Sequence, residues 1–172
     1  MQPKQEGFTL IELLIVVAII GIIAAIGVPG LLRARQSGNE ASAIGSIRAI
    51  NSAEATYAAT CGGGGFAQSL DDLALAPPGG IAFINDDLAA GLRSGYLFAV
   101  EDGADSQDVL MSIDTCNGAG ANSRTGFFVH AEPVQAGSTG QRSFASNNTQ
   151  SMYQKADGEA IANDMSDGLI LQ

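Results

Sequence analysis

A run of twenty residues without a charge, from Leu13 to Leu32, limits what this chain can fold into more than any other feature. As an α-helix, such a run is about 30 Å long, which matches the hydrocarbon core of a bilayer. Between Phe8 and Leu32 the single charged residue is Glu12, whereas the chain beyond this stretch is polar and rich in Gly, Ser, Asn and Asp. This division predicts a transmembrane helix at residues 8–32 joined to a soluble body.

Two simpler interpretations of the apolar run are a cleaved secretory signal and a plain membrane anchor. A signal has a shorter apolar region that ends at a small-residue cleavage site, and neither interpretation explains Glu12. A charge in a membrane segment is costly and needs a partner. Cleavage between Gly7 and Phe8 would create an α-amine that is largely cationic at neutral pH. Glu12 could neutralise the amine of its own chain or that of a neighbour, and the second arrangement would set the register of packed helices.

The sequence Gly7-Phe8-Thr9-Leu10-Ile11-Glu12-Leu13 resembles the prepilin processing motif of type IV pilins and type II secretion pseudopilins. The resemblance covers roughly the first third of the chain. It implies that residues 1–7 are a leader, that a membrane peptidase cuts after Gly7, and that the same enzyme methylates Phe8. It also implies that Glu12 acts in subunit assembly and that Pro29 lies where family members often carry a helix-loosening residue.

The helix is expected to continue past the membrane segment as an amphipathic stretch over residues 33–60. Pro29 lacks an N–H, so a softened stretch is predicted over residues 27–30. Apolar residues at spacings of three and seven predict the face that lies on a sheet: Ile44, Ile47, Ile50 and Tyr57. Polar positions around that face are assigned to Arg33, Arg35, Asn39, Glu40, Arg48, Asn51 and Glu54. Residues 8–60 are therefore predicted to form one long helix.

Residues 61–172 are predicted to form a globular head. The run Gly62–Gly65 ends the helix, and it is interpreted as a flexible exit because it lacks the Lys-Ser or Lys-Thr of a phosphate-binding loop. Ser69 is predicted to cap a short helix, with Asp72 at the capping-box position. Strands are predicted at residues 81–84, 96–100, 109–113, 127–131, 142–145 and 152–154. The fold class is thus α+β, a pilin fold with the long helix packed on a four- to five-stranded antiparallel sheet.

Cysteine and charge content restrict the compartment and the partners of the head. Cys61 and Cys116 lie far apart without a CxxC motif, which in an exported protein predicts one structural disulfide; two buried free thiols would fit a cytosolic body. The formal net charge of the chain is −10, and almost all of the excess lies beyond residue 70. An acidic surface repels phosphates, so we expect no direct nucleic acid binding.

Catalytic and metal-binding chemistry is weakly indicated. His130 is the single histidine, lies on a predicted strand and has no accompanying catalytic motif, so it is interpreted as structural, and no enzymatic activity or cofactor is expected. The acidic groups around residues 101–108 and 157–167 raise a calcium hypothesis, but their spacing does not match an EF-hand. A solvated acidic face is the preferred interpretation.

The function expected from the resemblance is that of a structural subunit of a type IV pilus. The precursor would be a single-pass inner-membrane protein, processed by prepilin peptidase and polymerised by the pilus or secretion assembly machinery into a homo-oligomeric helical filament outside the cell. One alternative is a type II secretion pseudopilin, which would build a periplasmic pseudopilus. Another is a membrane-anchored periplasmic domain that never polymerises.

Overall fold

A computed structural model describes residues 7–171 of the chain, so residues 1–6 of the expected leader lie outside the described residues. The chain divides between Arg35 and Gln36 into two compact units. Helix α1, Leu10–Thr60, runs through both of them. It stays helical across Pro29, so the helix does not melt there. A proline removes a single bond from the i→i−4 ladder, and the bonds on either side hold the helix together.

The second unit contains two short helices, a 3-10 turn and eight strands. Helix α2 is Leu70–Ala74, helix α3 is Asp86–Ala89, and the 3-10 turn is Ser112–Asp114. The strands are β1 Leu92–Arg93, β2 Tyr96–Asp102, β3 Asp108–Leu110, β4 Ser123–Arg124, β5 Phe127–Pro133, β6 Ser143–Asn147, β7 Met152–Lys155 and β8 Leu169–Ile170.

The main sheet has six antiparallel strands in the order β1-β2-β5-β6-β7-β8, and β3 pairs with β4 in a separate two-stranded sheet. The predicted α+β architecture, with a long helix on an antiparallel sheet, is therefore confirmed. The sheet has more strands than the expected four or five, because the expectation did not include the edge strands β1 and β8, which have two residues each and are exposed. Such short edge strands carry no alternating pattern that a sequence would reveal.

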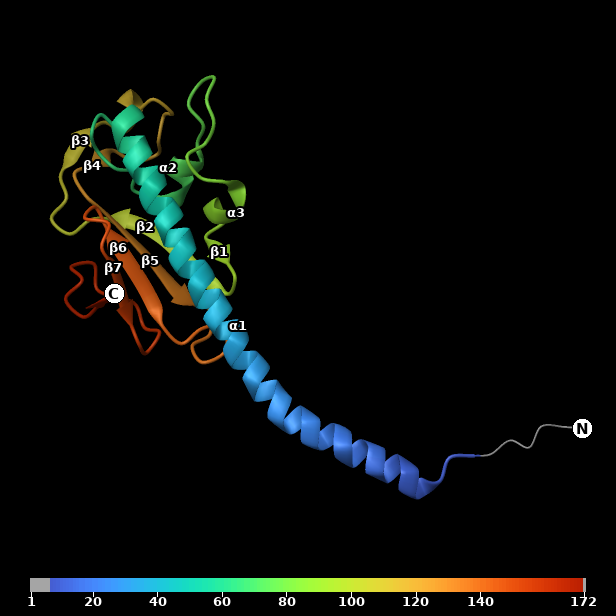
Figure 1. Cartoon of the computed structure of the whole chain (residues 1–172). Coiled ribbons are helices and arrows are strands. Elements are labelled where there is room, and N and C mark those ends of the chain that lie inside the picture. The colour runs from blue at the N-terminus through green and yellow to red at the C-terminus, as the bar shows by residue number, and fades with distance from the viewer. Residues whose placement is uncertain (1–6, 172) are drawn as a thin grey trace, which may run out of the picture. The chain divides into compact units, whose positions relative to one another are not determined.

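The second half of α1 lies across one face of the main sheet (Figure 1). Its buried stripe includes Ala43, Ile47, Ile50 and Tyr57, which have no exposed surface. Strand residues that alternate in β2, β5 and β6 complete this core: Tyr96, Phe98, Val100, Phe127, Val129, Ala131 and Phe144. The opposite face of the sheet holds a smaller cluster of Phe128, Ala145, Ile161 and Met165. The chain after β7 supplies the last two, so the C-terminal segment covers that second face.

Two expectations, one about the helix and one about a loop, are wrong. Glu40, Asn51 and Glu54, which the sequence placed at polar positions around the apolar face, are 7%, 6% and 0% exposed and lie at the buried interface. Residues 81–84 are not a strand: the N–H groups of Phe83 and Ile84 both donate to Leu73 O. This segment follows two prolines and two glycines and has no adjacent strand to pair with.

The glycine run after α1 is a closely packed turn and not a flexible exit. Gly62 and Gly65 are buried, and Gly62 O accepts a hydrogen bond of 2.7 Å from Ser123 Oγ. A Cβ on Gly62 would collide with Gly65 O and come within 2.7 Å of the Tyr57 ring. Gly63 and Gly64 have φ of 63° and 95°, a conformation that glycine adopts most readily. Close packing therefore explains why glycines occupy this turn.

Candidate functional site

The start of α1 carries the residues that the sequence assigns to processing and assembly. Gly7, Phe8 and Thr9 precede the helix in non-helical conformation and are exposed, with Phe8 85% exposed. A peptide bond in exposed, non-helical chain is accessible to a peptidase. Cleavage after Gly7 and methylation of Phe8 stay predictions, although the geometry is compatible with both.

Glu12 has hydrogen-bond partners of its own in the monomer. Its carboxylate Oε2 accepts from Thr9 N at 3.2 Å and from Thr9 Oγ1 at 2.9 Å. In return, Thr9 Oγ1 accepts from Glu12 N at 3.3 Å. This reciprocal pair is a capping box, which satisfies donors at the helix N-terminus that otherwise have no partner. Threonine followed three residues later by glutamate is the sequence signal of this motif, and the sequence interpretation missed it.

The capping box changes how Glu12 should be understood. The helix N-terminus carries a partial positive charge that stabilises a nearby carboxylate. Glu12 is therefore partly compensated before any second chain arrives. A partner amine from another chain would have to offer more than Thr9 and the helix end already provide.

The apolar part of α1 is suited by length and composition to cross a membrane; it is the single such helix in the described part of the chain. Its large side chains from Leu10 to Leu32 are all about half exposed or more. Pro29 lies within this segment, and its expected role in assembly is a prediction that the continuous helix does not test. The apolar surface requires a cover, whether lipid or protein.

The packed half of α1 is fixed to the sheet by an ion pair of Glu40 with Arg142. Glu40 Oε2 accepts from Arg142 Nη2 at 2.7 Å and from Nε at 3.0 Å, while Oε1 accepts from Gln141 N at 2.9 Å. Burial raises the pKa of Glu40, but these hydrogen bonds outweigh it and hold the pKa below its ordinary value. The guanidinium also lies 5.4 Å from the centre of the Phe144 ring. This cluster fastens the beginning of the packed helix to β6 and the turn before it.

Glu54 lies further along the same interface without an ion-pair partner. Its Oε2 accepts from Ala67 N at 2.8 Å, and its Oε1 has no partner among the described residues. Burial, together with the nearby charge of Asp72, raises the pKa of Glu54 well above its ordinary value. Asp72 is itself buried, and it accepts from Gly120 N instead of closing the capping box expected with Ser69. The Ser69 cap itself is present, since Ser69 Oγ accepts from Asp72 N at 3.1 Å.

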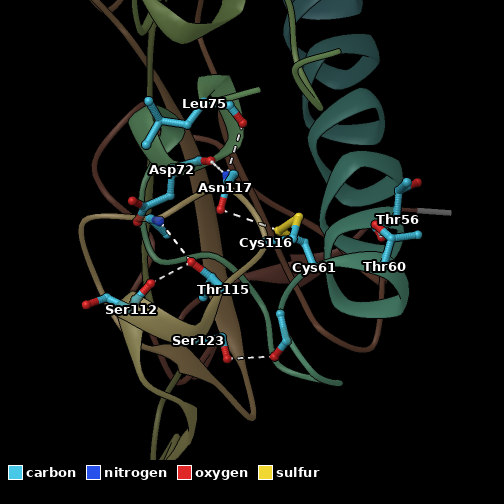
Figure 2. The surroundings of a disulfide bond; sticks show 12 residues. Thr56, Thr60, Cys61, Asp72, Leu75, Ser112, Thr115, Cys116, Asn117 and Ser123 are labelled. Atoms are coloured by element: carbon cyan, nitrogen blue, oxygen red, sulfur yellow. Dashed lines mark hydrogen bonds between the residues drawn. A yellow bond between two sulfur atoms is a disulfide. The ribbon is translucent and has the colours of Figure 1, made fainter. Parts of the chain in front are cut away.

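The expected disulfide between Cys61 and Cys116 is present and closes a loop of 55 residues. It joins the end of α1 to the segment after the 3-10 turn (Figure 2). Next to it, Asn117 Nδ2 donates to Asp72 O at 2.8 Å and to Leu75 O at 3.0 Å. The bond and the amide together hold α2 and the end of α1 to the 111–120 segment.

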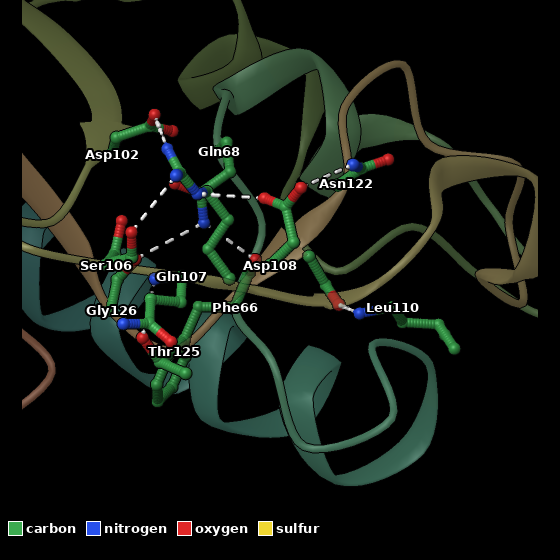
Figure 3. A network of polar contacts seen from close by, with 12 residues as sticks. Phe66, Gln68, Asp102, Ser106, Gln107, Asp108, Leu110, Asn122, Thr125 and Gly126 are labelled. Atoms are coloured by element: carbon green, nitrogen blue, oxygen red, sulfur yellow. Dashed lines mark hydrogen bonds and ion pairs between the residues drawn. The ribbon is translucent and has the colours of Figure 1, made fainter.

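In each of the two acidic groups, carboxylates form ion pairs with a basic side chain of the head. Arg124 pairs with Asp102 and Asp108 and donates to Ser106 O, in the network of Figure 3. Lys155 pairs with Asp167 at 3.0 Å and with Asp157 at 3.8 Å. Among residues 7–171, no group of three or more His, Cys, Asp or Glu side chains is placed to hold a metal ion.

His130 lies on the face of the sheet opposite α1, between two carboxylates. Its Nδ1 is 2.8 Å from Glu132 Oε1, its Nε2 is 3.6 Å from Glu101 Oε1, and its ring stacks on Phe128 at 5.2 Å. The ring is thus held by neighbours on its own and the adjacent strand, which is the environment of a structural histidine.

Comparison with known proteins gives matches to part of the chain. Residues 2–28 match the family model of the prokaryotic N-terminal methylation motif. The chain is 42% identical over 55 residues to the type IV major pilin protein PilA of Myxococcus xanthus, covering 32% of this chain and 25% of that protein. It is 37% identical over 54 residues to the type II secretion system core protein G of Escherichia coli, covering 31% and 37%. It is 63% identical over 37 residues to the type IV wide pilus major component PilA4 of Thermus thermophilus, covering 22% and 28%.

The matched region therefore spans between a quarter and about two fifths of these relatives. No solved structure matches the chain. The residues that match the methylation-motif model contain Gly7, Phe8, Glu12 and most of the apolar helix, while the head has a pilin-like architecture of one long helix on an antiparallel sheet. The N-terminal segment of this chain is that of the type IV pilin and type II secretion pseudopilin family.

Proposed function

We propose that the chain is the precursor of a structural subunit of a type IV pilus. It is inserted in the inner membrane, processed by prepilin peptidase after Gly7, methylated on Phe8 and polymerised into a helical filament. The observation that carries this proposal is the division of α1 into two environments. Apart from Glu12, the side chains of residues 10–32 are apolar and exposed, whereas from Glu40 onward the helix buries a stripe against its own sheet.

The exposed apolar half needs lipid before assembly and other copies of itself afterwards. Removing such a helix from lipid is unfavourable unless neighbouring helices replace the contacts that the acyl chains made. Glu12 adds a second requirement, because its carboxylate must keep a partner in the new environment. A neighbour's Phe8 amine meets that requirement and fixes the axial register at the same time.

The role of the head is structural in this proposal. Its histidine and several carboxylates of the two acidic groups pair with neighbours within the head, so we infer a coat subunit and not an enzyme. The subunit depends on an assembly machinery for extraction from the membrane. The acidic head would form the outside of the filament, where it repels nucleic acid.

A pseudopilin of a type II secretion system is the second candidate. Its support is the similarity to core protein G, which covers 31% of this chain, about as much as the 32% covered by the similarity to the pilin PilA. A third possibility is an anchored periplasmic domain that never polymerises. All three share the apolar helix, and they differ in where the mature chain is found.

The test is to determine the N-terminus by mass spectrometry in membrane fractions and in fractions sheared from the cell surface. The pilus proposal expects a mature chain that starts at N-methylated Phe8 and is present in the sheared fraction. The same terminus confined to the membrane would favour the pseudopilin. A chain that keeps Met1, or one trimmed after the apolar run, would overturn the pilin interpretation altogether.

A second experiment separates the two roles of Glu12. In Glu12→Gln the amide oxygen still accepts from Thr9, so the capping box is kept, but the charge that neutralises an amine is lost. A polymerising subunit should still insert and be cleaved, and should disappear from the sheared fraction. Glu12→Ala, which removes both the cap and the charge, should have the same effect. Normal amounts of Glu12→Gln filaments would refute the proposed pairing with the amine.

A further inference from the structure

Two cations of the head make no ion pair within the described part of the chain. Arg124, Arg142 and Lys155 each pair with a carboxylate of the head. Arg48 on α1 and Arg93 on β1 are exposed, and neither takes part in a salt bridge of residues 7–171. Beyond residue 35 the chain has sixteen acidic and five basic side chains. An exposed arginine that makes no ion pair with any of these carboxylates is available to a partner.

Arg48 lines an open groove on the head. The groove measures about 420 Å³ and is formed by Arg48, Asn51, Ser52 and Ala55 of α1 with Gln150 of the turn between β6 and β7. Arg48, Ser52, Ala55 and Gln150 are exposed, so the groove is accessible. Ser52 and Ala55 are small, which lets a side chain from outside approach the guanidinium closely.

Asn51 is the buried residue among those that line the groove. It is 6% exposed, and its Nδ2 donates to Ser146 Oγ at 2.8 Å, while its Oδ1 has no partner among the described residues. A buried polar atom without a partner is unfavourable, so the groove is polar at its base as well as at Arg48.

We propose that this groove binds a carboxylate side chain from the acidic head of a second copy of the chain. Arg48 supplies the fork of N–H donors that matches a carboxylate. The surplus of acidic over basic side chains in the head provides the complementary surface. This inference rests on the proposed function, since it requires copies to meet in a filament.

The symmetry of such a contact agrees with polymerisation. The groove on α1 and the carboxylate that enters it are different places on the chain, so a copy can receive a carboxylate from one neighbour and offer its own carboxylate to another, which makes the contact heterologous. Contacts of this heterologous kind continue from copy to copy and produce an open helical filament if they do not close into a ring. A pairing of identical patches would instead stop at a dimer.

The experiment compares Arg48→Glu with two controls in cells, measuring the amount of chain in the sheared fraction. Arg93→Glu has the same charge change at an exposed, unpaired arginine outside the groove, and Arg48→Lys keeps the charge but loses the fork. Arg48→Glu should reduce sheared filaments by about tenfold or more, because like charges opposed at an interface are strongly unfavourable. The amount of sheared filament from Arg48→Lys should lie between those from the wild type and Arg48→Glu, and the amount from Arg93→Glu should resemble that from the wild type.

Photo-crosslinking then identifies the occupant. With a benzophenone amino acid at Ala55, sheared filaments should yield crosslinks between two copies that map by mass spectrometry to an acidic segment of the head. Crosslinks to the apolar segment, to another protein or to no protein would overturn the inference. The Phe8 N-terminus and the Cys61–Cys116 disulfide of Arg48→Glu, measured in the membrane fraction, show whether this variant folds and is processed.

The outcomes separate the inference from the proposed function. If wild-type chain is absent from the sheared fraction, the proposed function fails and the inference fails with it. If wild-type and Arg48→Glu filaments occur in equal amounts, only the inference fails. If Arg93→Glu loses filaments as strongly as Arg48→Glu, general charge and not the groove governs assembly, which also overturns the inference.

Discussion

Replacing Glu54 with glutamine tests how the interface between α1 and the sheet holds a carboxyl group away from water. Glu54 has no exposed surface, and one of its two oxygens has no partner among the described residues. Glutamine keeps an oxygen for the N–H of Ala67 and has nearly the same shape, but it does not ionise in this range. The difference between the two proteins therefore reports the ionisation of Glu54 alone.

The sign follows from the direction of the pKa shift. Burial raises the pKa of Glu54 well above its ordinary value, so the folded chain holds this proton more tightly than the unfolded chain does. The stabilisation is fully present below the unfolded carboxyl pKa, and it is lost as the pH rises through the raised, folded pKa. Between these two values the free energy of unfolding falls by about 1.4 kcal/mol per pH unit relative to the variant. The stability of Glu54→Gln relative to the wild type should therefore rise as the pH rises above the unfolded carboxyl pKa.

The assay is urea unfolding of the full chain in detergent, followed by tyrosine fluorescence at a series of pH values. The chain has no tryptophan, and Tyr57 and Tyr96 are fully buried in the head, so the signal reports on the head. The stability difference between the wild type and Glu54→Gln should grow from acid toward neutral pH. Parallel curves for the two proteins would show that the carboxyl group is ionised and solvated in the folded head, and would refute the reasoning.

Glu40→Gln is the matched control on the same helix, because its pKa is lowered and the sign reverses. The stabilisation from Glu40 is present above the unfolded carboxyl pKa and is lost as the pH falls through the folded pKa. At neutral pH this variant should be less stable by about 1.5–3 kcal/mol, the usual contribution of hydrogen bonds to a charged group. A stability deficit that stays unchanged in acid would contradict the pairing with Arg142.

Two further perturbations have defined outcomes. Replacing Cys61 and Cys116 together with serine opens a loop of 55 residues, and should lower the free energy of unfolding by up to about 4 kcal/mol in the same urea assay; an unchanged midpoint would contradict a stabilising role. Thr9→Val removes the hydroxyl that caps α1 and should weaken the first helical turn by about 1 kcal/mol, measured as faster amide hydrogen exchange at Glu12 in micelles. Thr60→Val at the far end of α1 is the control and should leave exchange at Glu12 unchanged.

The sequence predicted α1 and the central strands because their signals are local. A charge-free run and apolar residues at helical spacing require no knowledge of partners, and the helix begins within two residues of the predicted start at Phe8. The cap of Thr9 on Glu12 has an equally local signal, threonine followed by glutamate three residues later. It was overlooked because the apolar run and the cleavage site accounted for both residues already.

The buried carboxylates could not be predicted in the same way. Glu40 is buried because it pairs with Arg142, which lies 102 residues later in the chain. No residue near Glu40 in the sequence indicates that partner. The strand expected at residues 81–84 failed for the converse reason. A short apolar segment becomes a strand when a neighbouring strand supplies its hydrogen bonds, and here Leu73 O accepts those N–H groups. In both cases a tertiary contact, and not the local sequence pattern, decided the structure.

Three glutamates of α1 show what assembly must achieve. Glu40 has an arginine, Glu54 keeps a raised pKa in an apolar site, and Glu12 is held by the helix end and by Thr9. In the proposed filament a neighbour's amine has to displace the Thr9 contacts of Glu12 or add to them. The free energy gained from the amine is therefore smaller than that of an ion pair formed with an uncompensated carboxylate. We therefore expect the pairing of Glu12 with the amine to set the register of the helices, while the apolar contacts hold the helices together. When a neighbour is out of register, Glu12 keeps its own contacts with Thr9. Weakening the cap should therefore make pairing with a neighbour more favourable, and Thr9→Val filaments should resist dissociation at low salt better than wild-type filaments do.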